Sequence, residues 1–362
     1  VVVCAGIWGR LIAEMAGEDL PVMPVDHPLT FFGPYTEFAG TGKDIGYPLL
    51  RDQGNSAYMR DTGDPTTAEG GMIEWGYYEE KNPRMVHPRD ILSKEQSSWS
   101  PSQRDLEMEQ ILEPLERAIE LTPILGELGY DERRSFNGLL QVTADGGPSC
   151  GESRKVRGLW YCVAIWVKDG PAYGKLIADW MTDGRTEVDH AKIDYARFYD
   201  HQLTEDFIAG RCFETGQKIY TPAVHPREPF GNGRNIKRSP FYEREKALGG
   251  YFMELGGWER AHGYAANEHL LEKYGDRVPV RENEWDNRHF WRVSNAEHLA
   301  MSDDVGMVNL SHFYIFDVEG PDHVNAMEWI CAAKIGGDAN IGKGIYTHFL
   351  DDQGMVRADL TI

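Results

Sequence analysis

Several features that mark other classes of protein are absent or scarce in this sequence. No run of residues approaches the about 18 consecutive apolar residues of a membrane-spanning helix. Positively charged residues are outnumbered, since the sequence has 37 Lys and Arg against 58 Asp and Glu and a net charge of −21. Nucleic acids and anionic membranes both require a basic surface, so we expect neither as a partner.

Cysteine is also scarce, and its positions suggest neither a disulfide framework nor a zinc site. The sequence contains no Cys-x-x-Cys pair, and its histidines lack the compact spacing of metal ligands. We therefore expect no metal, buried thiols and a reducing compartment, which is the cytoplasm or, in a eukaryote, the mitochondrial matrix. The five cysteines stand at positions 4, 150, 162, 212 and 331.

An initiator methionine and a Gly-x-Gly-x-x-Gly dinucleotide-binding pattern are missing as well. The chain opens on Val1-Val-Val-Cys and closes on Ala358-Asp-Leu-Thr-Ile362, and both stretches read as the middle of a strand. We therefore expect an internal fragment of a longer polypeptide.

The pattern along the chain predicts an α+β protein of three parts: 1–185, 186–240 and 241–362. The middle part is polar and rich in proline, yet it keeps enough aromatic residues for a small connecting domain. Strands are expected at 1–5, 21–32, 57–60 and 158–167, and helices at 8–16, 105–121 and 171–181. Further along we expect a helix from 239 to about 255, strands at 305–310 and 314–318, a helix at 322–333, and a hairpin of 345–349 with 356–362.

The stretch 136–175 favours a flat, anionic ligand. Its glycines let the backbone pass close to a ring system, and a strand then leads to a helix that opens at Gly170-Pro171. The free N–H groups and the dipole of such a helix can hold a negative oxygen, such as the C2 oxygen of a reduced flavin. The residues expected at the cofactor are Gly146, Gly147, Pro148, Lys168, Asp169, Gly170 and Tyr173, although Lys168 could equally be a solvated loop residue.

The order of several motifs resembles the amino-acid-oxidase-type FAD oxidoreductases, and among these the dimethylglycine and sarcosine dehydrogenases. The motifs in the first part are Val3-Cys-Ala-Gly-Ile-Trp8, Tyr58-Met-Arg60, Gly146-x-Pro-x-x-Gly-Glu152 and Gly170…Trp180. Arg238-Ser-Pro-Phe-Tyr242 and Gly257-Trp-Glu-Arg260 resemble the central junction. Val308-Asn-Leu-Ser311 and Gly354-x-Val-x-Ala-Asp-Leu-Thr361 resemble the start of a glycine-cleavage T-protein-like domain.

The resemblance implies a substrate site on the first part of the chain. His27 would orient a tertiary amine or help to keep it unprotonated, and the Tyr58 hydroxyl would bind a substrate carboxylate with Arg60 as a cationic partner. Trp75 and Tyr78 would wall the pocket. The alternatives are a structural histidine, a cross-strand tyrosine beside an exposed arginine, and aromatic side chains that pack in the core.

The resemblance also implies Asp359 as a third catalytic residue, next to tetrahydrofolate, although an acid on a hairpin is usually solvated. The implied function is FAD-dependent oxidative demethylation of an N-methylated glycine or a related small methylamine, with one-carbon transfer to tetrahydrofolate. An electron-transfer flavoprotein or oxygen would take the electrons. The alternatives are a folate-dependent aminomethyltransferase with a degenerate flavin domain and a non-catalytic subunit of an oxidase complex. Without a dinucleotide fold, the chain alone is expected not to hold FAD.

Overall fold

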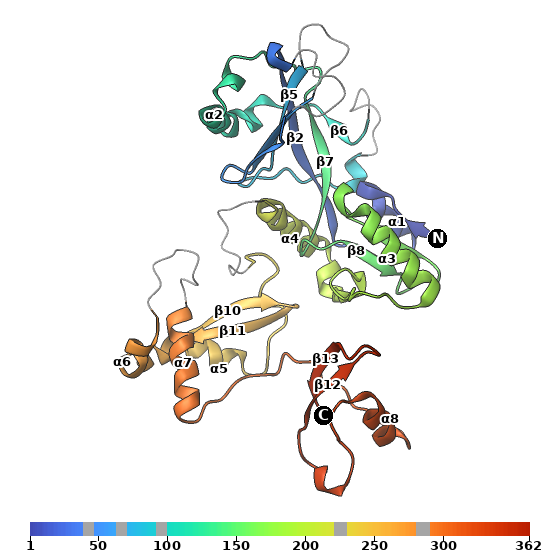
Figure 1. Cartoon of the computed structure of the whole chain (residues 1–362), viewed down its shortest axis with the longest axis vertical. Coiled ribbons are helices and arrows are strands. Elements are labelled where there is room, and N and C mark those ends of the chain that lie inside the picture. Colours follow the sequence, from blue (N-terminus) through green and yellow to red (C-terminus); the bar gives the residue numbers. More distant parts are fainter. Residues whose placement is uncertain (39–46, 63–70, 92–99, 221–229, 280–289) are drawn as a thin grey trace. The chain divides into compact units, whose positions relative to one another are not determined.

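The computed structural model describes residues 1–38, 47–62, 71–91, 100–220, 230–279 and 290–362 (Figure 1). By their internal contacts they form two compact units, Val1–Val308 and Asn309–Ile362. Helices and strands occur in both units, which confirms the expected α+β class. The predicted boundaries at 185 and 240 lie inside the first unit and stay predictions.

The largest sheet of the first unit has six strands in the order β3-β4-β5-β2-β7-β6. Its long central strand β2 (Val22–Tyr35) pairs antiparallel with β5 (Gly71–Tyr77) on one side and with β7 (Phe136–Thr143) on the other (Figure 1). Successive side chains of a strand point to opposite faces, so this sheet has two different faces. The outer strands are β3 (Leu50–Asp52), β4 (Ala57–Asp61) and β6 (Gln103–Arg104).

The two faces of this sheet have different neighbours. One face carries Trp75 within a large apolar cluster to which α2 (Leu112–Leu121) contributes its buried side. The other face carries Met23 and Val25, which pack with α4 (Glu205–Lys218). His27, which is two residues beyond Val25 on β2, therefore points to the same face as Val25.

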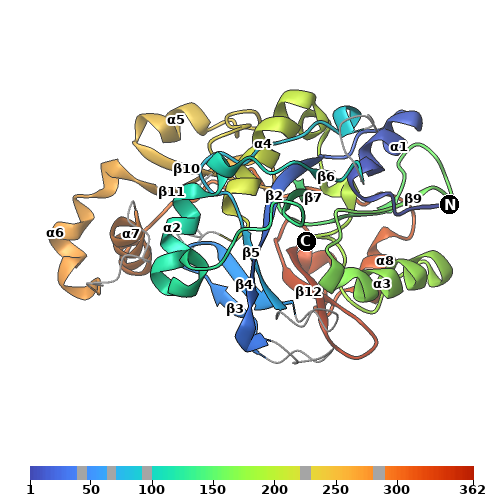
Figure 2. The ribbon, with the colours of Figure 1, turned by 90° about the horizontal axis from the view of Figure 1, so that it is seen from above.

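A smaller sheet has the order β1-β9-β8, with β1 (Val2–Val3) parallel and β8 (Ser149–Glu152) antiparallel to β9 (Trp160–Val163). The helices α1 (Gly9–Met15) and α3 (Gly170–Asp183) lie on either side of β9 (Figure 2). The two helices cover opposite faces of β9. Helix α1 packs against the face that carries Tyr161, and α3 packs against the face that carries Trp160.

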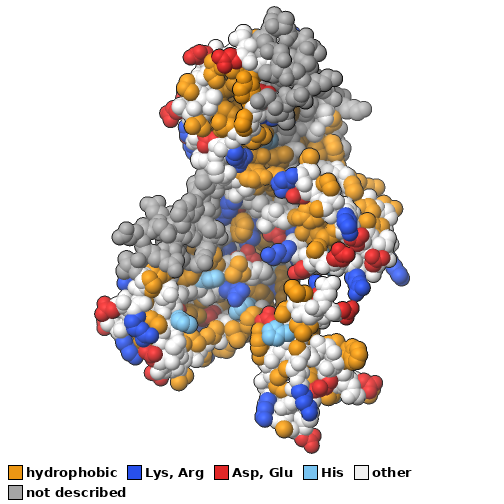
Figure 3. Space-filling model, viewed as in Figure 1, with side chains coloured by type: hydrophobic (Ala, Val, Ile, Leu, Met, Phe, Trp, Pro, Cys, Tyr) orange, Lys and Arg blue, Asp and Glu red, His pale blue; other side chains and the backbone are white. Residues whose placement is uncertain are grey.

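The remainder of the first unit is a hairpin with helices around it, namely α5 (Tyr242–Ala247), β10 (Gly250–Leu255), β11 (Trp258–Tyr264), α6 (Leu270–Tyr274) and α7 (Trp291–Asp303). The second unit contains α8 (His323–Ile330) and the hairpin β12 (Tyr346–Leu350) with β13 (Val356–Thr361). Many of its apolar side chains are exposed, and some are visible as orange patches at the bottom of Figure 3. Among the described residues, no helix is both long and apolar enough to cross a membrane.

Most of the expected elements of the first 185 residues are confirmed, including the end of α3 at Gly184, which adopts φ +70°. The helix expected over 105–121 is shorter and begins at Leu112. The helix expected from 239 to about 255 is confirmed only over α5. It stops at Ala247, because Gly249 takes φ +71°, and a strand follows. Strands expected at 305–310 and 314–318 are wrong, and the chain there has no regular structure.

Candidate functional site

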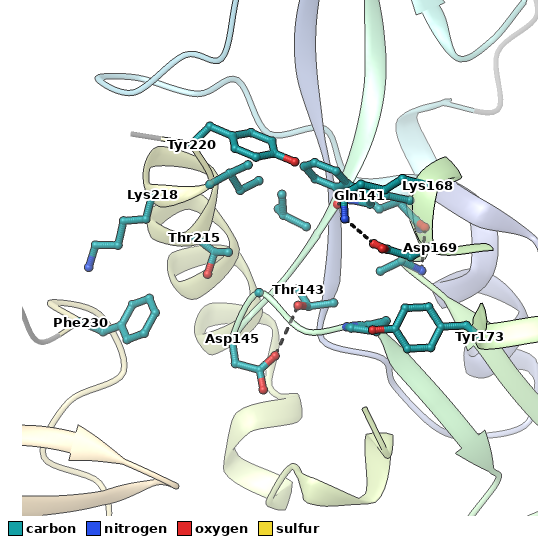
Figure 4. Close-up of a pocket in the computed structure, with 16 residues that line it drawn as sticks. Gln141, Thr143, Asp145, Lys168, Asp169, Tyr173, Thr215, Lys218, Tyr220 and Phe230 are labelled. Atoms are coloured by element: carbon teal, nitrogen blue, oxygen red, sulfur yellow. Dashed lines mark hydrogen bonds and ion pairs between the residues drawn. The ribbon is translucent and has the colours of Figure 1, made fainter. Parts of the chain in front are cut away.

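A cavity of about 370 Å³ lies between β7, the start of α3 and the end of α4 (Figure 4). It mixes apolar, polar and charged side chains. The lining residues used below are Gly146, Pro148, Trp166, Lys168, Asp169, Tyr173 and Tyr220.

The structure brings most of the expected cofactor residues to this one cavity. Gly146, Pro148, Lys168, Asp169 and Tyr173 line it, from two segments that are separate in the sequence. The other two expected residues, Gly147 and Gly170, belong to the same segments but are not among the lining residues.

The glycine loop before β8 is held in place by an ion pair. Arg197 contacts both carboxylate oxygens of Asp145, with Nε 2.7 Å from Oδ2 and Nη2 2.8 Å from Oδ1. The Asp145 carboxylate also accepts the N–H of Gly147 at 3.1 Å, and Thr143 donates to the Gly147 carbonyl at 2.6 Å. Gly146 takes φ +81°, which a residue with a side chain rarely adopts.

The start of α3 borders the cavity beside Lys168 and Asp169. Gly170 and Pro171 open α3, which continues directly from the helical turn Val167–Asp169. The Gly170 N–H donates to the Trp166 carbonyl at 3.1 Å, and proline has no N–H. A Cβ added at Gly170 or at Gly174 would meet no atom within 4 Å, so a flat group could approach the backbone there. Lys168 lies 2.7 Å from Asp169, and that hydrogen bond raises the pKa of the Lys168 ammonium. Lys168 is therefore a cation that this side of the cavity offers to an anionic group.

Three aromatic side chains form a second group on the α4 side of the six-stranded sheet. Nε2 of His27 lies 2.9 Å from the hydroxyl oxygen of Tyr58. The His27 ring stacks on Tyr78, with ring centroids 4.4 Å apart and planes at 26°. His27, Tyr58 and Tyr78 come from β2, β4 and the end of β5, so strand pairing assembles this cluster.

Gly76 is the residue that lets Tyr58 reach His27. The two residues pair directly across β4 and β5, and the tyrosine ring lies over the glycine. A Cβ on Gly76 would stand 2.2 Å from Cζ of Tyr58 and 2.4 Å from its hydroxyl oxygen. Sequence reasoning missed this role, although a glycine inside a strand pattern is a known sign of close approach.

Burial sets the protonation of this cluster. His27 is 8% exposed, and desolvation lowers the pKa of its imidazole to about 4, with the Tyr77 backbone acting in the opposite direction. Its Nδ1 atom is buried and has no hydrogen-bond partner among the described residues. Burial also raises the pKa of the Tyr58 hydroxyl. Near neutral pH the pair is therefore a neutral imidazole and a neutral phenol.

The other two expected substrate residues differ in position: Arg60 lies on the same face of the sheet as Tyr58, and Trp75 does not. The guanidinium of Arg60 pairs with Glu74 across the two strands at 2.9 Å, and that contact raises the pKa of Arg60. Trp75 is fully buried on the opposite face of the sheet and stacks with Tyr77. It is an odd number of residues from Tyr78, and side chains of a strand alternate between the two faces. Trp75 therefore packs in the core, which was the alternative interpretation, and we do not carry it forward as a pocket residue.

Arg51 is a cation of the site that sequence reasoning missed. Its guanidinium carbon lies 5.2 Å from the ring centre of Tyr78 and 4.6 Å from that of Tyr220. Nε donates to Gln53 at 3.2 Å, whereas Nη2 is buried and has no hydrogen-bond partner among the described residues. A buried donor of this kind is available to a carboxylate.

Tyr220 joins the aromatic cluster to the cavity. Its ring lines the cavity, lies 4.6 Å from the ring of Tyr78 and lies 5.6 Å from that of Trp166. The segment that follows Tyr220, residues 221–229, lies outside the described residues. The expected substrate cluster and the expected cofactor loop thus meet through one tyrosine, which no motif in the sequence marked.

Asp359 lies in the second unit, on β13 and opposite His348 of β12. Its side chain is exposed and accepts a hydrogen bond from the Tyr346 hydroxyl at 3.1 Å, which raises the pKa of that tyrosine. Within the part of the chain that the structure describes, no group of three His, Cys, Asp or Glu side chains could hold a metal ion.

Three family models match consecutive parts of the chain. They are the FAD dependent oxidoreductase over residues 1–180, the FAD dependent oxidoreductase central domain over 183–239, and the GCVT N-terminal domain over 241–362.

Several curated proteins are similar to the chain over its whole length. A 4-methylaminobutanoate oxidase (formaldehyde-forming) of Paenarthrobacter nicotinovorans is 28% identical, with 100% of this chain and 40% of that protein covered. The mitochondrial sarcosine dehydrogenase of Mus musculus is 26% identical, with 100% and 39% covered. The mitochondrial dimethylglycine dehydrogenase of Rattus norvegicus is 24% identical, with 100% and 40% covered. The chain spans about two fifths of the length of these relatives.

A protein of another kind also matches. The mitochondrial pyruvate dehydrogenase phosphatase regulatory subunit of Mus musculus is 25% identical, with 99% of this chain and 39% of that protein covered.

Proposed function

The chain has the domain architecture of FAD-dependent oxidoreductases of the dimethylglycine and sarcosine dehydrogenase type, and we propose that it forms the amine-binding side of a flavin site. The observation that carries the proposal is the contact series His27–Tyr78–Tyr220, which leads from the buried histidine to the wall of the cavity at α3. The reaction is oxidative demethylation of a small N-methylated amino acid.

The chain's own groups position the amine. The chemistry that FAD supplies when bound is acceptance of a hydride from the N-methyl carbon. A neutral His27 does not repel an amine, and it can exchange a hydrogen bond with the substrate or with the Tyr58 hydroxyl. Lys168, beside the start of α3, would hold the negative charge that the ring gains on reduction.

We assign the substrate carboxylate to Arg51 in place of Arg60. The Arg60 guanidinium is already paired with Glu74, whereas Nη2 of Arg51 is buried beside Tyr78 without a partner among the described residues. A charge-assisted hydrogen bond at this position favours methylamines that carry a carboxylate over those that do not.

One-carbon transfer to tetrahydrofolate is the second part of the proposal. The match of residues 241–362 to the GCVT N-terminal domain supports it, and Asp359 is the acid we assign to the pterin amine. An electron-transfer flavoprotein as electron acceptor stays a prediction, because no residue described above bears on it.

The test is reduction of the flavin by an amine in the absence of oxygen. The polypeptide that carries residues 1–362, loaded with FAD, is mixed with sarcosine, dimethylglycine or 4-methylaminobutanoate, and the flavin absorbance is followed. His27→Gln and Tyr58→Phe should slow reduction about 100-fold, which is typical of losing a group positioned in the transition state. Tyr130→Phe is the matched control, because Tyr130 packs with Phe32 in the apolar cluster of the opposite face.

Similarity to a regulatory subunit favours one alternative, a non-catalytic binding subunit. In that case FAD binds but none of the three amines reduces it, and the His27 and Tyr58 variants behave as the unmodified protein does.

A further inference from the structure

Three cysteines that are distant in the sequence stand side by side across the smaller sheet. Val3 pairs with Tyr161 in the parallel strands β1 and β9, so Cys4 comes next to Cys162. On the other side of β9, Cys162 is the direct cross-strand partner of Cys150 in β8. The row of thiols is therefore Cys4, Cys162 and Cys150, and all three thiols are free.

The sheet geometry brings these cysteines within reach of one another. The N–H of Cys150 donates to the Ile193 carbonyl at 2.8 Å, which points it away from β9 and makes Cys150 and Cys162 a non-hydrogen-bonded pair. Such pairs have Cα atoms about 4.5 Å apart, and neighbouring parallel strands are about 4.8 Å apart. Both separations lie within the roughly 4.4 to 6.8 Å that a disulfide spans.

Exposure and charge differ along the row. Cys150 is fully buried, Cys162 is intermediate and Cys4 is exposed, so solvent reaches the row from the Cys4 end. The neighbouring thiols of Cys150 and Cys4 lower the pKa of the Cys162 thiol to about 7, although its burial acts in the opposite direction. Burial and the neighbouring Cys162 raise the pKa of the Cys4 thiol. The thiolate thus forms first on the central sulfur, and the thiolate is the reactive form.

We propose that Cys162 and Cys4 are an oxidation site that closes a reversible disulfide on exposure to a peroxide. The Cys162 thiolate attacks hydrogen peroxide: an S–O bond forms, the O–O bond breaks, and hydroxide leaves. The Cys4 sulfur then attacks the Cys162 sulfenic acid, so that an S–S bond replaces the S–O bond and a water leaves. In total two thiols lose two electrons, one peroxide gains them, and two waters form.

The site lies against the helix that borders the cavity. Cys150 and Cys162 belong to the same packed cluster as Tyr173 and Trp180 of α3, and Tyr173 lines the cavity. The disulfide would join β1 to β9 beneath this helix, so the thiol state would act on the wall of the cavity. The inference does not depend on the amine reaction, because its oxidant can be added.

Thiol counting on the 362-residue chain tests the inference. The protein is treated with a few equivalents of hydrogen peroxide, quenched, unfolded and titrated for free thiols. We expect the count to fall by two from the five present, to recover fully with dithiothreitol, and peptide mapping to find Cys4 joined to Cys162.

Single variants make the assignment specific. Cys4→Ser and Cys162→Ser should each abolish the reversible loss, and Cys4 is exposed, so its replacement leaves the core intact. Cys331→Ser is the matched control, because Cys331 lies in the other unit and should leave the loss of two thiols unchanged. An unchanged count, a Cys150–Cys162 cross-link in place of Cys4–Cys162, or a loss that dithiothreitol does not reverse would each overturn the proposal.

Discussion

At the scale of single residues, the site depends on groups that are buried without a full set of partners. Nδ1 of His27 and Nη2 of Arg51 are both buried and have no hydrogen-bond partner among the described residues. Leaving a donor or acceptor in this state costs about 1–3 kcal/mol each, which the rest of the fold must offset. Such atoms are the ones a bound substrate would satisfy.

Burial of His27 should make stability depend on pH. Its folded-state pKa is about 4, whereas an unfolded histidine has about 6.5, so the unfolded chain binds the proton first as the pH falls. Between pH 6.5 and 4 this histidine should therefore remove about 3 kcal/mol from the free energy of unfolding. Urea unfolding of the unmodified chain and of His27→Gln at both pH values measures the difference. Parallel pH slopes in the two proteins would contradict the assignment.

Replacement of Gly76 by alanine tests how Tyr58 is positioned. The new Cβ would overlap the tyrosine ring and push its hydroxyl away from His27 without a change of charge. We expect kcat for the amine to fall about 10- to 100-fold, since a displacement of about 1 Å has this effect. The double variant with Tyr58→Phe should be little worse than either single one. Full activity of Gly76→Ala would show that the ring position does not matter.

Removal of the Arg51 charge should act on carboxylate substrates alone. We expect Arg51→Met to weaken binding of sarcosine about 10- to 100-fold, which corresponds to the loss of one charge-assisted hydrogen bond. Binding of a methylamine without a carboxylate should change less than twofold. Arg60→Met is the matched control, and the idea fails if it weakens sarcosine binding as much as Arg51→Met does.

At the scale of elements, strand alternation decides which residues can meet. On β5, Trp75 and Tyr77 point to the apolar cluster, whereas Glu74 and Gly76 face the side of Tyr58. Sequence reasoning assigned both Trp75 and Tyr78 to the pocket wall, and it did not predict β5 as a strand. A shift of one residue separates a core side chain from a site side chain.

Replacement of Gly151, which lies in β8, should destabilise the fold. Gly151 has φ +119°, and a Cβ there would stand 2.9 Å from the Asp194 carboxylate and 3.2 Å from the Trp180 ring of α3. Gly151→Ala should therefore lower the free energy of unfolding by about 1–3 kcal/mol. Gly275→Ala serves as the control, because its φ is ordinary and its Cβ would meet nothing within 4 Å. Equal unfolding midpoints for the two variants would contradict the argument.

At the scale of the whole molecule, the cavity offers donors for the ring end of a flavin, and the sequence contains no Gly-x-Gly-x-x-Gly turn for its ADP end. We therefore expect the 362-residue chain to lose added FAD on gel filtration. Riboflavin, which lacks the ADP, should bind with an affinity within about tenfold of that of FAD, because the residues proposed for the site would contact the ring alone. Elution of a yellow protein with stoichiometric FAD would be inconsistent with this expectation.

Much of the local structure follows from sequence pattern alone. The apolar alternation of β2, the Pro-started α3 with its glycine end, and the final hairpin were predictable because each depends on neighbours a few residues away. The ordered motifs also indicated the architecture that the family models confirm. The helix predicted from residue 239 was drawn too long, because the signals at its start did not indicate that Gly249 would end it.

The chemistry of the candidate site was decided by tertiary structure. The sequence by itself named His27 and Tyr58 as candidates and placed the glycine loop beside a helix start. Only strand pairing puts Tyr58 over Gly76, pairs Arg60 with Glu74, and leaves Arg51 against Tyr78. The physical reason is that burial and hydrogen-bond partners depend on neighbours in three dimensions. Burial sets the pKa of His27, and the absence of a partner among the described residues makes Arg51 available to a carboxylate.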